Sequence, residues 1–198
     1  MKPIIKQALN HAMTYQQYRT LVNDLHAMGK ATGPIQSEAM THYSELNIQR
    51  MNKWDKHFKL TDEQAAEIAK ITDKQTWLVI AEGWCGDASH ALPVMNAFAT
   101  INSNIEFAVV LRDENLELMD QYLTNGGRSI PKLIILDEDL NEIGTWGPRP
   151  KEAGAIYTRA KEENTPKEEF NKQVQVWYAR NRGKAIADEL IETALQPV

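Results

Sequence analysis

A short apolar run that leads directly into a turn containing a cysteine constrains the fold of this chain most strongly. Residues 76–81 are largely apolar, and residues 82–90 read Glu-Gly-Trp-Cys-Gly-Asp-Ala-Ser-His before an amphipathic stretch begins. The run is typical of a strand covered on both faces, so Cys85 is expected where a strand ends and a helix begins. The first turn of a helix offers unpaired backbone N–H groups and a partial positive charge, and both favour a thiolate over a thiol.

Cys85 is the only cysteine among the 198 residues, which excludes an internal disulfide and a multi-cysteine metal site. A reducing compartment is therefore expected. Residues 1–7 contain no apolar segment long enough for the core of a signal peptide, and no later run approaches the length of a membrane span. The sequence thus predicts a cytoplasmic protein without a membrane partner.

The charge and composition favour a small-molecule or protein partner over nucleic acid. The formal net charge is -5, and 42% of the residues are apolar, so no basic surface for a polyanion is expected. No metal and no other cofactor are expected, because the histidines of the N-terminal region lack partners at the spacing of metal ligands. These histidines are His11, His26, His42 and His57. The sequence leaves the oligomeric state open.

The first third of the chain is expected to be helical. Apolar residues recur at helical spacing over residues 3–29, with a break or restart near Thr14, and again from residue 35 or 37 to residue 58. A third helix is expected from Thr61 to about residue 71. Thr14 and Thr61 each begin a capping-box pattern, with glutamine three residues later. Residues 1–73 are therefore predicted to form an N-terminal helical extension.

The remainder of the chain alternates strands with helices, and this order favours parallel strands with right-handed crossovers. The last two strands are close enough in sequence to form an antiparallel hairpin. Pro166 is expected at the first position of a helix, and Gly183 at a bend or an end. The expected strands are 76–81, 105–111, 132–136 and 140–145, and the expected helices lie at 87–100, from 115 to about 124, and within 151–198.

These features together resemble the thioredoxin family. The βαβ unit, the Trp-Cys-Gly turn, the Ile-Pro pair at residues 130–131 before a hairpin and the closing helix each match the family pattern, over about residues 74–147. The resemblance implies an α/β thioredoxin-like fold, with residues 74–198 as the domain and residues 1–73 packed on its core. The added helices look like those of a bacterial thioredoxin-like subgroup of undefined role.

The resemblance also implies a site around Cys85, which occupies the attacking position of the family. Trp84 and Pro131 would flank the groove that receives extended substrates, and the Ile130–Pro131 peptide bond is expected to be cis. Backbone groups of Gly86, Asp87 and Ala88 would complete the site beside the sulfur.

Three departures from the family pattern limit the chemistry. Ala88 replaces the second cysteine, so a dithiol exchange within one molecule is excluded. Asp87 replaces the proline between the cysteines, and its charge would oppose formation of a thiolate. Val79 replaces the buried acid that accepts a proton in the resolving step. The three replacements are mutually consistent, because a site without a second thiol has no need of that acid.

Two functions from different classes remain. The first is monothiol redox chemistry or redox sensing, in which Cys85 forms mixed disulfides with a protein or a low-molecular-weight thiol. The second is a non-catalytic binding or interaction module that uses the groove or the added helices.

The roles of several neighbouring residues are more ordinary. Ser89 and His90 could approach the thiol, but such residues are more often solvated or cap the helix. Asp87 is interpreted as an acid of the first helical turn rather than a catalyst, because a carboxylate there favours the helix dipole wherever it faces water. Arg112 and Arg128 are candidates for holding an anionic substrate. Residues 146–150 either line one edge of the site or end the sheet, and their two prolines favour the second interpretation.

Overall fold

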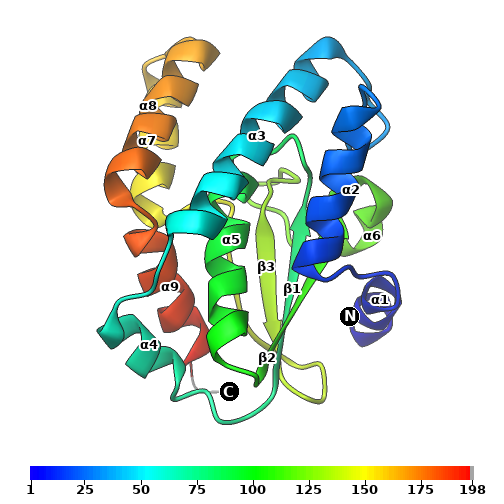
Figure 1. Cartoon of the computed structure of the whole chain (residues 1–198), viewed down its shortest axis with the longest axis vertical. Helices are drawn as coiled ribbons and strands as arrows, with labels where there is room; N and C mark the ends of the chain where they lie inside the picture. The colour runs from blue at the N-terminus through cyan, green and yellow to red at the C-terminus, as the bar shows by residue number, and fades with distance from the viewer. Residues whose placement is uncertain (197–198) are drawn as a thin grey trace.

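The computed structural model describes residues 1–196 and places a four-stranded sheet at the centre of the molecule (Figure 1). The strand order is β2-β1-β3-β4, with β1 parallel to β2 and the pairs β1–β3 and β3–β4 antiparallel. The predicted parallel pair and hairpin are thus confirmed. The strands are β1 (Gln75–Ala81), β2 (Ile105–Leu111), β3 (Lys132–Leu136) and β4 (Glu142–Trp146).

The start of β4 differs from the prediction by two residues, and the turn before it explains why. Leu140 has a φ of 60° and lies in the turn rather than in the strand. The Asp137 carboxylate accepts hydrogen bonds from the backbone N–H groups of Asp139 (2.9 Å) and Asn141 (2.8 Å). Such an Asx-type turn competes with extended structure, so pairing begins only at Glu142.

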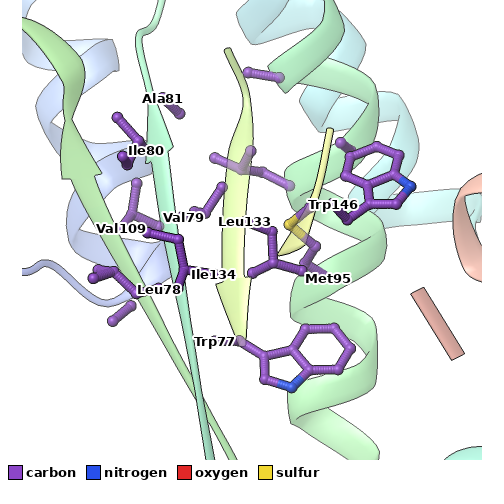
Figure 2. Close-up of a cluster of buried hydrophobic side chains, with 14 of the residues drawn as sticks. Trp77, Leu78, Val79, Ile80, Ala81, Met95, Val109, Leu133, Ile134 and Trp146 are labelled. Carbon is purple, nitrogen blue, oxygen red and sulfur yellow. The ribbon is translucent and has the colours of Figure 1, made fainter. Parts of the chain in front are cut away.

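The centre of the sheet is fully buried on both faces. Residues 77–81 of β1 have no exposed surface, and Figure 2 shows their side chains packing with those of Val109, Leu133, Ile134 and Met95. The near-continuous apolar sequence of β1 is the pattern expected for a strand that has no solvent-facing side.

Helices cover both the faces and the outer edge of the sheet. Helix α5 (Gly86–Ile101) follows β1 and packs against α3 (Glu38–His57), while α9 (Lys184–Ala194) packs against α5 and β4. Helix α1 (Lys2–Leu9) contacts β2. Between α1 and α2 (Tyr15–Ala27), Met13 pairs with Val109 through two backbone hydrogen bonds of 2.8 Å each. The edge of β2 is therefore partly occupied rather than left open.

The helix starts predicted for the N-terminal region are confirmed. Thr14 and Thr61 form reciprocal capping boxes with Gln17 and Gln64, and Ser37 caps α3. Helix α4 spans Asp62–Ile68. Buried residues of these helices belong to the same apolar cluster as β1, among them Ile5, Tyr18, Val22, Met51 and Ile68. The boundary between residues 73 and 74 stays a prediction.

The helix expected after β2 is much shorter than predicted. A 3₁₀ turn (Arg112–Glu114) is followed by α6, which spans only Leu116–Met119. Asn115 does not cap this helix with its side chain. Its Nδ2 group instead donates to the carbonyl of Leu111 at 2.9 Å, which favours the 3₁₀ turn.

The C-terminal helices are α7 (Lys151–Glu162), α8 (Lys167–Asn181) and α9. Pro166 is the N-cap of α8 rather than its first residue, so the helix begins one position later than predicted. Gly183 has a φ of 81° and separates α8 from α9 as predicted; a Cβ atom there would lie 2.8 Å from the ring of Trp54. The predicted helix extended to Val198, and its last two residues lie outside the described residues. Within residues 1–196, no helix combines the length and apolarity needed to cross a bilayer.

Gly147 fixes the position of the loop after β4. Its φ is 111°, and a Cβ atom there would lie only 2.2 Å from the carbonyl oxygen of Pro131. The Nζ group of Lys132 donates to the Gly147 carbonyl at 3.3 Å. The loop therefore lies directly on the Ile130–Pro131 segment.

We expect Gly147→Ala to lower the free energy of unfolding by at least about 2 kcal/mol, because it combines an unfavourable φ with a backbone clash. Gly126→Ala is the matched control, since Gly126 also has a positive φ (75°) but has nothing within 4 Å of the added Cβ. Urea denaturation measures both. Equal losses in the two variants would contradict the close approach to Pro131.

Candidate functional site

Cys85 is the N-cap of α5, at the end of the turn that follows β1. Its backbone N–H donates to the Glu82 carbonyl at 3.0 Å, and its Sγ donates to the Ile130 carbonyl oxygen at 3.3 Å. The Ile130–Pro131 peptide bond is cis. The fold thus brings Cys85 beside Ile130 and Pro131, which are 45 residues away along the chain. The cysteine is only 8% exposed.

The environment of Cys85 favours the protonated thiol. Burial raises the pKa of the thiol to about 12, and the nearby Asp87 carboxylate acts in the same direction. The backbone N–H groups of Ala88 and Asp87 and the charge of Arg149 lower the pKa, but by less. The helix start thus acts on the thiol in the expected direction, but it is not the largest influence on the pKa. The favourable backbone groups are present, and desolvation outweighs them.

Asp87 lies in the first turn of α5, as the sequence suggested, but it does not face water. Its Oδ1 accepts a hydrogen bond of 2.9 Å from the Tyr178 hydroxyl, and its Oδ2 lies 2.7 Å from the Arg149 guanidinium. The carboxylate is therefore buried between α8 and the loop after β4. Residues 146–150 both end the sheet and line the site, so the preference for ending the sheet as their only role is corrected.

His90 is likewise buried rather than solvated. Trp54 Nε1 donates to His90 Nδ1 at 2.9 Å, and His90 Nε2 lies 2.9 Å from Gln175 Oε1. This pattern assigns the proton to Nε2. The ring stacks on that of Tyr178 at 4.0 Å, and burial lowers the pKa of His90 to about 4. His90 is therefore neutral near pH 7 and ties α5 to α3 and α8. Both ring nitrogens are occupied, so neither serves the thiol.

Ser89 also has another partner, since its hydroxyl donates to the Gly86 carbonyl at 2.6 Å. The hydroxyl therefore closes the first turn of α5 and is not directed at Cys85.

The N-terminal helices hold the turn before Cys85. The Gly83 N–H donates to Thr32 Oγ1 at 2.9 Å, and the Gly83 carbonyl accepts from Asn47 Nδ2 at 2.9 Å. A Cβ atom on Gly83 would lie 3.0 Å from a methyl group of Val22. The extension thus forms one wall of the site and satisfies buried backbone groups of the motif.

Trp84 is half-buried, and the guanidinium of Arg112 lies 4.9 Å from the centre of its ring. Arg112 also pairs with Asp113 at 2.8 Å, while Arg128 pairs with Asp120 at 2.6 Å. The two arginines that the sequence offered as anion-binding candidates are therefore already neutralised by carboxylates.

Glu82 is a buried acid that sequence reasoning missed. It has no exposed surface, and its Oε1 accepts a hydrogen bond of 3.0 Å from the Asp113 N–H. Its Oε2 has no partner among residues 1–196, and burial raises its pKa. The one signal in the sequence is its position directly after the apolar run of residues 77–81.

The side chains that lie against the first turns of α5 were mostly missed. They come from three separate segments, and only one of these, residues 146–150, was offered by the sequence as an edge of the site. The residues concerned are Arg50 and Trp54 of α3, Arg149 of the loop after β4, and Gln175 and Tyr178 of α8.

A family model described as thioredoxin matches residues 33–161, which is more than half of the chain. The chain therefore belongs to this thioredoxin family. The match begins before α3, so it includes part of the N-terminal helical region.

Two solved structures have the same fold over most of their length. A protein of unknown function from Pseudomonas aeruginosa is 16% identical, with a TM-score of 0.58 over 91% of this chain and 96% of that chain. An HIV epitope-scaffold is 14% identical, with a TM-score of 0.58 over 89% and 98%. Comparison with curated proteins gave no match.

The buried neutral His90 predicts an acid-sensitive contribution to stability. Its folded-state pKa of about 4 lies below the usual 6.5, so the unfolded chain binds more protons than the folded chain between these two values. The free energy of unfolding therefore decreases as the pH is lowered through this range. The loss should reach at most about 3 kcal/mol near pH 4. Burial raises the pKa values of Glu82 and Asp87, and these two groups therefore contribute stability that increases as the pH is lowered. The contribution of His90 is isolated by comparing variants with the wild type.

We therefore expect His90→Gln to show a shallower loss of stability between pH 6.5 and 4 than the wild type, measured by urea denaturation. His57→Gln, which removes an exposed histidine, is the control and should follow the wild type. If all three proteins have the same pH dependence, His90 is not held neutral.

The contacts of Asp87 predict that its removal activates Cys85. Asp87→Asn removes a negative charge beside the thiol and weakens the tie to Arg149, so the rate of alkylation by iodoacetamide at pH 8 should rise roughly tenfold. Asp120→Asn also breaks an arginine–carboxylate pair, but one outside the contacts of Cys85, and should leave the rate unchanged. A wild-type rate in Asp87→Asn would contradict the assigned effect of the carboxylate.

Proposed function

We propose that this chain is a thioredoxin-fold monothiol protein in which Cys85 exchanges disulfides after the polar side chains over it have moved. The observation that carries the proposal is the position of the sulfur, 3.3 Å from the Ile130 carbonyl beside the cis Pro131 at the start of α5. An extended substrate could form backbone hydrogen bonds here and take the place of the thiol as the partner of the Ile130 carbonyl.

The reaction needs no second cysteine. The Cys85 thiolate attacks one sulfur of a disulfide R–S–S–R′, which forms the mixed disulfide Cys85–S–S–R and releases R′–S⁻. A low-molecular-weight thiol R″–SH, after loss of its proton, attacks the R sulfur. It releases the Cys85 thiolate and forms R–S–S–R″. Thiol and disulfide are conserved in number at each step, and the external thiol supplies the reducing equivalents.

The closed arrangement would be a slow nucleophile. A thiol with a pKa of about 12 rather than 8.5 has a thiolate fraction near pH 7 that is about three orders of magnitude lower. A thiolate of higher pKa is also a stronger nucleophile, and this offsets part of the lower thiolate fraction. The rate of disulfide exchange would then be about a hundredfold lower than for an ordinary thiol. Movement of Arg149 and Tyr178 would return water to the site, remove part of the burial and leave the helix-start N–H groups in place.

A second candidate is a non-catalytic binding module on the same fold. The burial of Cys85 and its high pKa favour this alternative, because a packed cysteine behaves as a small apolar residue. In that case the helices around the motif would bind the partner, and binding would not require the sulfur of Cys85.

Mixed-disulfide formation discriminates the two functions. We expect the folded protein, incubated with 2-hydroxyethyl disulfide at pH 8, to form an adduct at Cys85 that glutathione removes, as detected by mass spectrometry of the intact chain. The denatured protein is the positive control, because its only thiol is then free, and Cys85→Ser is the negative control.

No adduct in the folded protein, with full reaction of the denatured one, would refute monothiol exchange. Capture of a partner that is equally strong for the wild type and Cys85→Ser would then support the binding module.

A further inference from the structure

Arg50 carries a half-buried charge that no carboxylate neutralises. Its Nη1 donates to Asn47 Oδ1 at 2.8 Å, and no ion pair of Arg50 occurs within residues 1–196. Burial lowers the pKa of its guanidinium, with the field of Asp87 acting against this. A guanidinium that loses water without gaining a carboxylate is costly to the fold, which points to a use outside it.

Arg50 lies directly beside the reactive turn. Its Nη1 is 3.6 Å from the position that a Cβ atom on Gly86 would occupy, and Gln175 Nε2 is 3.7 Å from the same position. The Oε1 atom of Gln175 is engaged with His90, so its amide nitrogen is the group turned toward Gly86. Two nitrogen donors from α3 and α8 therefore converge next to Cys85, and Gly86 places no side chain against them.

The local charge balance is positive. Arg50 and Arg149 contribute two positive charges and Asp87 one negative charge, while His90 is neutral. Asp87 is already bonded to Arg149 and Tyr178, so it is not free to pair with Arg50 as well. The backbone N–H groups in the first turn of α5 add partial positive charge at the same place. The N-cap residue does not use its side chain to accept a hydrogen bond from them.

We propose, on the basis of the thiol exchange described above, that Arg50 and Gln175 bind a carboxylate of the low-molecular-weight disulfide that reacts with Cys85. A guanidinium with an adjacent amide suits a carboxylate, because both present N–H donors to its two oxygens. Arg50 is thus a specificity-determining residue, and disulfides that carry carboxylates react faster than neutral or cationic ones.

The test compares three disulfides of different charge: glutathione disulfide, 2-hydroxyethyl disulfide and cystamine. The rate of adduct formation at Cys85 is measured at pH 8 by mass spectrometry and divided by the rate for the denatured chain, which removes the intrinsic reactivity of each reagent. The wild type should favour glutathione disulfide over 2-hydroxyethyl disulfide by about tenfold, the factor for one hydrogen bond to a charged group.

Three variants isolate Arg50. Arg50→Gln should lose this preference, and Arg50→Lys should retain part of it, because lysine keeps the charge but not the planar fork. Arg180→Gln removes one positive charge from an exposed position of α8 and should behave as the wild type. Equal normalised rates for all three reagents in the wild type, or an unchanged preference in Arg50→Gln, would overturn the role of Arg50 and leave monothiol exchange intact.

A binding measurement covers the case in which no reagent reacts. In Cys85→Ser, glutathione disulfide should raise the melting temperature more than cystamine does, and Arg50→Gln in the same background should abolish the difference. Absence of reaction together with this shift would refute exchange but support the carboxylate site. Absence of both would refute both.

Discussion

The buried Asp87 carboxylate is the contact on which the arrangement around the cysteine depends. It receives the Tyr178 hydroxyl from α8 and the Arg149 guanidinium from the loop after β4, and it lies in the first turn of the helix that Cys85 begins. A buried carboxylate is tolerated only when it is paired and hydrogen-bonded, so these partners must stay in place. The same charge raises the pKa of the thiol, so one residue both holds the cover and keeps the sulfur protonated.

The helices outside the thioredoxin core hold the residues on both sides of Cys85 in position. Thr32 and Asn47 bind the N–H and carbonyl groups of Gly83, and Trp54 binds His90. The motif is therefore held from the N-terminal side by α3 and the segment before it, and from the C-terminal side by α8. The family match begins at residue 33 and therefore includes α3.

The sequence predicted those features that depend on local pattern. Alternating strands and helices, the capping boxes at Thr14 and Thr61, and the meeting of Cys85 with Pro131 follow from periodicity, capping chemistry and family resemblance. The environment of the site did not follow, because it is made by residues distant in sequence. The burial of Asp87 and His90 was not predicted, since nothing near them in the chain shows that α3 and α8 would bury them.

The placement of the sulfur also bears on how copies of this chain behave toward one another. A chain with one exposed thiol and no internal partner for it can be oxidised only by joining to another molecule, including a second copy of itself. At 8% exposure, Cys85 is inaccessible to so large a partner in the present arrangement of the side chains. The burial of the thiol thus protects the protein from covalent self-association.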